Sequence, residues 1–217
     1  MNHNPFIAPY DQLPVTMPVF PLPGAIVMPG SDLPLNIFEP RYLNMVNDAL
    51  GSHRMIAMIQ PDPDAGDKDR FCHTGCAGRI TQYRETSDGR IEIVLRGVCR
   101  YDLDQVLSTT RGYRLIVPDW ARFSGDYADH EAELREEHDR LVRALKRYFE
   151  ANRLETDWSE LEQLPTLKLM NSLSMVLPFS ERDKQALLET IAPADQLFTF
   201  IALLGSGLHV SGQVTRH

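Results

Sequence analysis

Hydrophobic and polar positions in the first half of the chain follow the two-residue period of β-strands. The clearest case is RIEIVLRGVCRYDLD at 90–104, whose odd positions are mostly apolar and whose even positions are mostly charged. Shorter segments rich in strand-forming residues, with turn residues between them, precede and follow it. The predicted strands are 15–20, 33–38, 55–59, 74–84, 90–104 and 113–117.

Two of these segments indicate how the strands are arranged. MIAMI at 55–59 is apolar throughout, which predicts a strand buried on both faces. The segment 90–104 is longer than a usual strand of about five or six residues. Gly97 lies midway on its apolar face, where a strand can bend at the corner of a barrel. Six or seven strands with such bends predict a closed or nearly closed β-barrel.

The stretch FPLPGAIVMPGSDLPLNIFEPRY at 20–42 mixes prolines with strand-forming residues. Proline lacks an N–H, so it is confined to edge strands, strand starts and bulges. We therefore predict short edge segments at the barrel rim, with Pro18, Pro21 and Pro23 blunting the edge. Pro40 suits the first turn of a helix, and an apolar stripe from Tyr42 to Leu50 predicts one that ends at Gly51.

After Trp120 the period changes to that of helices. Residues 128–153 predict one helix of about 25 residues, with i,i+4 pairs such as Glu131 and Arg135 on its polar face. Residues 159–177 predict a helix interrupted near Pro165. A capping box of Ser180 and Asp183 starts the next helix, and 193–205 predict a last one that ends at Gly205.

This layout predicts an α+β fold with two parts. Residues 1–122 would form a β-barrel subdomain with one short helix, and residues 123–217 an all-α helical bundle. The first 14 residues are polar and contain proline, so we expect them to be loosely held. The oligomeric state stays open, because the long helix could pack within the chain or against a second copy.

Composition and charge exclude several classes of function. The net charge of -8 and the pI near 5.3 disfavour nucleic acid and anionic membranes as partners, since both bind clustered Lys and Arg. The start of the chain lacks the basic and apolar regions of a secretory signal, and no apolar run is long enough to span a bilayer. We therefore expect a cytoplasmic protein.

Two segments resemble metal sites, but their spacing argues against both. In CHTGC, Cys72 and Cys76 would lie about 13 Å apart on an extended segment, too far for one zinc ion. Cys76 and Cys99 fit core thiols better, and three cysteines make a disulfide framework improbable. PDPDAGDKD at 61–69 has its aspartates at Asp62, Asp64, Asp67 and Asp69. Counted from Asp62, the sixth and twelfth positions, where an EF-hand loop needs glycine and glutamate, hold Asp67 and His73, which favours a solvated loop.

No motif predicts catalysis. G-x-S-x-G and H-E-x-x-H are absent, and the seven histidines are scattered. Lys168 and Ser172 lie four residues apart on a predicted helix, a spacing that arises easily by chance. We therefore predict no catalytic residue, no metal and no cofactor.

Several motifs together resemble the N-terminal, substrate-binding domain of Lon proteases, which is also found in cereblon. The segments that carry the resemblance are FPLPGAIVMPGSDLPLNIFEPRYLNMV at 20–46, TGCAGRI at 74–80, LRGVCRYDL at 95–103 and NSLSMVLPFSERDKQALLE at 171–189. In the first segment the matching positions are Phe20, Pro21, Leu22, Pro29, Gly30, Leu35, Ile37, Phe38, Glu39, Arg41 and Tyr42. The resemblance extends over about residues 15–205.

The resemblance implies a PUA-like β-barrel followed by a helical bundle that recognises protein substrates. The chain has no G-x-x-x-x-G-K-[ST] loop, so we expect a stand-alone binding module that is not an enzyme. Its expected partners are unfolded or tagged polypeptides, and it could work with a separate protease or chaperone. RNA binding and small-molecule binding are the alternatives, and the acidic charge disfavours the first.

The candidate substrate-binding residues lie around the proline-rich stretch. Glu39 and Arg41 would anchor a peptide beside Phe38 and Tyr42, or would only fix the strand-to-helix junction, with the carboxylate capping amides. We favour the structural role for the two charged residues. An exposed edge with Phe20 and Met28 could also accept an extended polypeptide as an added strand.

Overall fold

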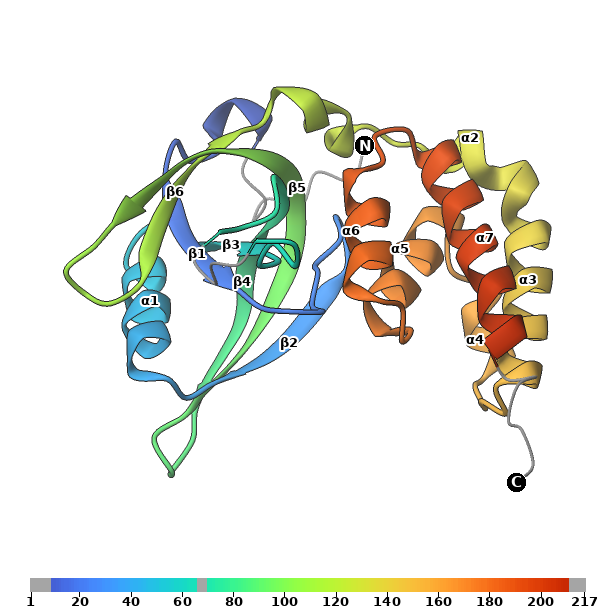
Figure 1. Cartoon of the computed structure of the whole chain (residues 1–217), viewed down its shortest axis with the longest axis horizontal. Helices are drawn as coiled ribbons and strands as arrows, with labels where there is room; N and C mark the ends of the chain where they lie inside the picture. The colour runs from blue at the N-terminus through green and yellow to red at the C-terminus, as the bar shows by residue number, and fades with distance from the viewer. Residues whose placement is uncertain (1–8, 66–69, 211–217) are drawn as a thin grey trace.

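The computed structural model describes residues 9–65 and 70–210, and it has an α+β fold with the strands in the first half and most helices in the second. Figure 1 shows the sheet on one side and the helices α2–α7 on the other, with α6 nearest the sheet and α1 packed on its far side. The predictions for residues 1–8, Asp67 and Asp69 lie outside the described residues. The strands are β1 Met17–Pro21, β2 Asp32–Ile37, β3 Met55–Ile59, β4 Thr74–Glu85, β5 Ile91–Ser108 and β6 Arg114–Asp119.

The six strands form one mixed sheet in the order β2-β5-β4-β3-β1-β6, and β5 also pairs with β6. The pairings therefore run in a ring from β5 through β4, β3, β1 and β6 back to β5. Only β1 and β3 pair in parallel; the other ladders are antiparallel. The 18-residue β5 makes the ring possible, because its first part pairs with β2 and β4 and its last part with β6.

Gly97 allows a loop to lie directly against β5. A Cβ atom at this position would lie 2.1 Å from the carbonyl oxygen of Met28. Gly97 exchanges backbone hydrogen bonds with this loop, accepting from Gly30 and donating to Ser31, both at 2.9 Å. The ladder to β4 shifts register beside it, between Ala77 and Gly78. A close backbone approach is thus what requires glycine here.

The prediction that β1 is an edge strand is wrong. Val19 pairs with Ala57 of β3 on one side and with Arg114 of β6 on the other. Each ladder has only three residue pairs, so the missing N–H groups of Pro18 and Pro21 interrupt little of the sheet.

The strand-to-helix junction forms where it was predicted, before α1 (Pro40–Leu50). Glu39 is the N-cap residue, and its carbonyl oxygen accepts hydrogen bonds from the amides of Tyr42 and Leu43. Its carboxylate caps no helix amide, contrary to the prediction, and instead accepts a hydrogen bond from Arg41 at 2.9 Å. The junction is therefore fixed by backbone geometry and by Pro40, not by carboxylate capping.

The predicted 25-residue helix is divided into α2 (Glu131–Leu134), a 3-10 turn η3 (Arg135–Glu137) and α3 (His138–Ala151). The reason is a contact distant in sequence: the Glu131 carboxylate accepts from the amide of Thr166 at 2.7 Å, and His138 contacts the Thr166 hydroxyl at 3.1 Å. Glu131 thus caps another helix and does not pair with Arg135.

The remaining helices are α4 (Trp158–Leu161), α5 (Thr166–Val176), α6 (Glu181–Glu189) and α7 (Pro193–Val210), with short 3-10 turns η1 (Tyr10–Gln12) and η2 (Ala121–Tyr127) elsewhere. The break near Pro165 and the Ser180 cap are confirmed; the Ser180 hydroxyl accepts from the amide of Asp183 at 3.1 Å. The prediction that α7 ends at Gly205 is wrong. The helix continues through Gly205 and Gly207, and glycine is required at 207 because a Cβ there would lie 2.7 Å from the Tyr148 ring.

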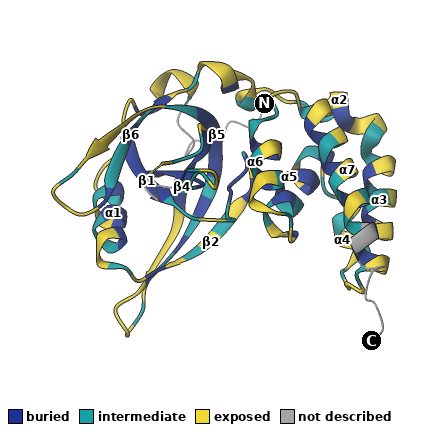
Figure 2. Ribbon diagram, in the orientation of Figure 1, coloured by how far each residue is buried: buried dark blue, intermediate teal, exposed yellow. Residues whose placement is uncertain are grey.

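Buried side chains form one cluster on each face of the sheet and a third among the helices. Figure 2 shows the buried residues lining the inward sides of both halves. Cys76 and Cys99 belong to the two sheet clusters, which confirms them as core thiols.

Polar groups join the two halves. The buried Arg100 side chain pairs with Asp126 at 2.6 Å and donates to carbonyl oxygens at and after the end of α6. Lys184 donates to the carbonyl of Gly24 at 2.9 Å, and Asn171 to that of Pro29 at 3.1 Å. Because these bonds have fixed directions, they hold α5 and α6 in a defined position against the sheet.

Candidate functional site

The structure brings only part of the predicted site to the surface. Phe20 and Met28 are 7% and 0% exposed, so the prediction that they line an exposed edge is wrong. Both belong to one core cluster of the sheet: Phe20 lies on β1, and Met28 lies in the loop that packs against β5 at Gly97. The Phe20 ring instead packs edge-on against the Tyr42 ring, with 4.5 Å between the ring centroids.

The other four residues lie around the start of α1. Phe38 is 62% exposed, and the Arg90 guanidinium lies 5.9 Å from its ring centroid. Arg41 and Glu39 form an ion pair whose side chains are half exposed. Arg41 also lies over the Tyr42 ring at 4.5 Å.

Arg41 and Tyr42 line a hollow of about 340 Å³ between α1, the start of β6 and the connection from β3 to β4. We call it the arginine end. Phe71 forms its far wall, and the Arg114 guanidinium lies 5.6 Å from the Phe71 ring centroid. The hollow therefore offers aromatic faces with two guanidinium groups beside them.

The tip of the hairpin between β5 and β6 is fixed beside this hollow. The Tyr113 hydroxyl donates to the Asp48 carboxylate at 2.7 Å, and Arg111 pairs with the same carboxylate at 2.6 Å. Burial and the bond to Asp48 raise the pKa of Tyr113 to about 12, so the hydroxyl remains a donor at neutral pH. Gly112, with a positive φ of 86°, brings the backbone close to Arg41.

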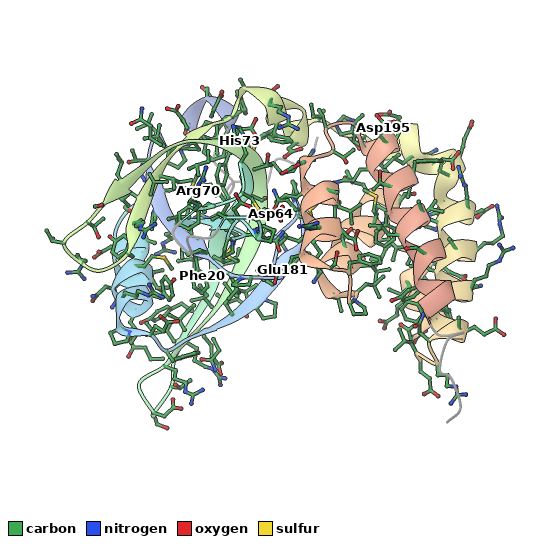
Figure 3. The ribbon with its side chains drawn as sticks, in the orientation of Figure 1. Phe20, Asp64, Arg70, His73, Glu181 and Asp195 are labelled. Atoms are coloured by element: carbon green, nitrogen blue, oxygen red, sulfur yellow. The ribbon has the colours of Figure 1, made fainter. Side chains whose placement is uncertain are left out.

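A second hollow, of about 570 Å³, lies on the other side of Pro61 and Phe71, which line both. We call it the acidic end, because its charged lining residues are Asp62, Asp64, Glu181, Glu189 and Arg182. Figure 3 labels Asp64, His73 and Glu181, which come from the β3–β4 connection, the residue before β4 and the start of α6. The two hollows adjoin at Pro61 and Phe71, and together they are here called the Phe71 groove.

Two glutamines fix the walls of the acidic end. Gln60 accepts from the amide of Gly24 at 3.1 Å and donates to the carbonyl of Glu181 at 3.0 Å. Gln185 donates to the carbonyl of Thr74 at 3.0 Å and to the Glu189 carboxylate at 2.7 Å. Gln60 is 1% exposed, so α6 is attached to the sheet by satisfied, buried amide groups.

The carboxylates of the acidic end line the same hollow as the Cys72 thiol. Burial raises the pKa of Cys72 from its ordinary value of 9.0 to about 11, and the nearby charges of Asp62, Glu189 and Glu181 raise it as well. Within residues 9–65 and 70–210, no group of three His, Cys, Asp or Glu side chains is placed to hold a metal ion. His73 instead contacts Asp102 at 3.1 Å.

Sequence reasoning found Arg41 and Tyr42 but missed the rest of the groove. Gln185 and Glu189 lie in the helical KQALLE motif, which marked the resemblance but carried no predicted role. Phe71 and Glu181 are far apart in sequence and meet only because α6 packs against β4. No local pattern could have joined them.

The fold is that of an α+β domain, and its surface carries two adjoining hollows lined by charged side chains of both signs. A family model described as the ATP-dependent protease La (LON) substrate-binding domain matches residues 16–205. The chain belongs to this family, which confirms the resemblance. Within the described residues, no helix is both long and apolar enough to cross a membrane.

Individual proteins are also similar to this chain in sequence. A Lon protease from Elusimicrobium minutum is 24% identical over 215 residues, 92% of this chain and 25% of that protein. Protein cereblon from Danio rerio is 30% identical over 78 residues, 36% of this chain and 18% of cereblon. The chain therefore spans only a quarter or less of either relative.

Two solved structures share the fold. The Lon N-terminal domain protein from Xanthomonas campestris has a TM-score of 0.63 at 24% identity, over 86% of this chain and 97% of that one. The N-terminal domain of Lon protease from the Mycobacterium avium complex has a TM-score of 0.64 at 18% identity, over 88% and 98%. At these identities the likeness concerns the fold alone.

Proposed function

We propose that this chain is a polypeptide-recognition module that holds segments of unfolded or tagged proteins in the Phe71 groove. The observation that carries the proposal is the groove itself, in a member of the Lon substrate-binding family: aromatic walls and charged side chains line two open hollows that meet at Phe71. Such a surface suits an extended chain, whose alternate side chains can enter successive pockets.

The exposure of each predicted residue decides which role we propose for it in binding. Arg41 contacts the polypeptide directly, and Tyr42 provides a wall. Glu39 lies next to the groove through its ion pair with Arg41, exposed Phe38 precedes it in the chain, and in this proposal both contact polypeptide that extends past the end of the groove. Phe20 and Met28 are too buried for direct contact.

We further propose that the ring of paired strands is a PUA-like barrel, that residues 123–217 are a helical bundle, and that the boundary lies at 122–123. In this proposal the protein acts in the cytoplasm, catalyses no reaction, needs no cofactor, and passes bound chains to a separate protease or chaperone. RNA binding and small-molecule binding remain the alternatives. No observation in the groove favours RNA, because its second hollow is acidic.

Fluorescence anisotropy tests the proposal. The probe is a labelled protein whose cysteines are alkylated so that it stays unfolded without denaturant, and the same protein in its folded form is the comparison. We expect micromolar binding of the unfolded form alone, worth about 8 kcal/mol. Absence of binding up to about 1 mM, or equal binding of the folded form, contradicts the proposal.

A matched pair of variants locates the binding site. Phe71→Ala removes the shared wall of the groove, and we expect about a tenfold loss of affinity because it takes away an aromatic anchor. Phe198→Ala removes an equally large side chain, 63% exposed, from α7 in the helical half, and should leave the affinity unchanged. Thermal unfolding of both variants checks that each is folded.

A further inference from the structure

The two ends of the Phe71 groove carry opposite charges. At the arginine end the only charged lining residues among those described are Arg41 and Arg114. At the acidic end four carboxylates face a single arginine. A bound polypeptide that spans both hollows, as the proposed function requires, therefore meets two different electrostatic environments.

The positive end can accept an additional carboxylate. Arg41 is paired with Glu39, but the two side chains are 52% and 43% exposed. Exposed ion pairs contribute little to stability, so an incoming carboxylate can replace or share that partner at small cost. The guanidinium plane lies against the Tyr42 ring, which holds it in position without using all its donors.

The negative end has carboxylates in excess. Asp64 is paired with Arg182. Asp62 accepts only a backbone amide, that of Asp64 at 3.0 Å, and Glu189 accepts from the neutral amide of Gln185. Among the residues that the structure describes, no cation pairs with Asp62 or Glu189, and Glu181 adds another negative charge at the start of α6.

We propose that the groove selects polypeptide segments by charge pattern: an acidic side chain or a terminal carboxylate lies beside Arg41 at the arginine end, an apolar side chain contacts Phe71, and a Lys or Arg side chain lies among Asp62, Glu181 and Glu189. This inference rests on the proposed function and names the substrate class of the same site. Charge complementarity of this kind contributes selectivity and association rate more than total affinity.

Four synthetic peptides test the inference. Each has a central leucine and a charged position on either side, separated by about five residues so that an extended chain covers roughly 17 Å. The pairs of charged positions are Asp and Lys, Asp and Asp, Lys and Lys, and Ser and Ser. A spacer series of about three to seven residues allows for the true span. The order of the Asp and Lys positions along the peptide is not fixed by the inference, because a peptide can bind the groove in either backbone direction.

We expect the Asp and Lys peptide to bind about fivefold to tenfold more tightly than the two like-charged peptides at low salt, with the difference shrinking at high salt. Glu181→Lys should shift the preference to the Asp and Asp peptide, and Arg41→Glu should shift it to the Lys and Lys peptide. Matched controls make the same charge changes far from the groove: Glu155→Lys, on an exposed loop, and Arg147→Glu, on the exposed face of α3. Neither control should change the order.

The outcomes separate this inference from the proposed function. If the unfolded probe binds and Phe71→Ala weakens it, but the four peptides bind equally or the two groove variants do not change the order, the charge pattern is wrong and the proposed function stands. If neither peptides nor the unfolded probe bind up to about 1 mM, both fail.

Discussion

The buried ion pair of Arg100 and Asp126 should dominate the attachment of the helical half to the sheet. The two side chains are only 6% and 5% exposed, and they contact each other at 2.6 Å. Arg100 also donates to the carbonyl oxygens of Leu188, in the last turn of α6, and of Thr190 and Ile191, which follow this helix. Asp126→Asn keeps the shape but leaves a buried cation without its counter-charge, a change that typically costs about 3–5 kcal/mol.

This cost is large compared with the whole stability of a domain, about 5–15 kcal/mol. In urea unfolding, with a slope of roughly 3 kcal/mol per molar for a chain of this size, the midpoint should fall by about 1–1.7 M. The assay is urea denaturation followed by tryptophan fluorescence and circular dichroism. Coincident transitions would show that both halves still unfold together.

Glu39→Gln provides the matched control, because it breaks an ion pair with Arg41 that is half exposed. We expect it to cost less than about 1 kcal/mol. The double variant Arg100→Met, Asp126→Leu should cost clearly less than the sum of its single changes, since no unpaired charge remains. If Asp126→Asn costs no more than Glu39→Gln, the pair does not join the halves and the reasoning is refuted.

Three further predictions follow from the packing and the thiol. Cys72 should be alkylated at pH 8 roughly a hundredfold more slowly than a thiol of ordinary pKa, because its pKa of about 11 leaves less thiolate. The alkylation rate, measured by peptide mass spectrometry, should keep rising through about pH 10. A plateau of the rate near pH 9 would contradict the prediction. Gly97→Ala should cost about 2–3 kcal/mol or more in urea unfolding, since a Cβ would lie 2.1 Å from a backbone oxygen, and a loss below about 0.5 kcal/mol would refute that contact. In α7, Gly207→Ala should destabilise the protein, because the added Cβ clashes with Tyr148. Gly205→Ala has no atom within 4 Å of its added Cβ and should stabilise the protein by up to about 1 kcal/mol. Equal thermal unfolding midpoints for the two variants would argue against the packing of this helix.

The strands and α1 could be predicted because their signals are local. The alternation in β5 and the apolar run of β3 each give the correct element within a few residues. The division at η3 could not be predicted, because it depends on Glu131 capping α5 through Thr166, 35 residues later. A helical period alone predicts a continuous helix there. The predicted end of the last helix at Gly205 was wrong for a similar reason, because glycine in this part of α7 does not mark a helix end: Gly207 is required by a tertiary contact.

The candidate site could be predicted only where one motif contained it. Arg41 and Tyr42 lie in the proline-rich motif and also line the groove. Phe20 belongs to the same motif but is buried, because it packs in a core cluster with residues distant in sequence, such as Met58. Phe71 and Glu181 meet through tertiary packing and carry no shared pattern.

Protection of Cys72 from alkylation by a bound polypeptide tests the central claim most directly. Cys72 lines the acidic end of the groove, whereas Cys76 and Cys99 are buried and serve as internal references. We predict that a saturating concentration of the unfolded probe slows alkylation of Cys72 at pH 9 by about tenfold or more, and that its folded form does not. An unchanged rate while the unfolded probe is bound would place the polypeptide elsewhere on the molecule and contradict the account.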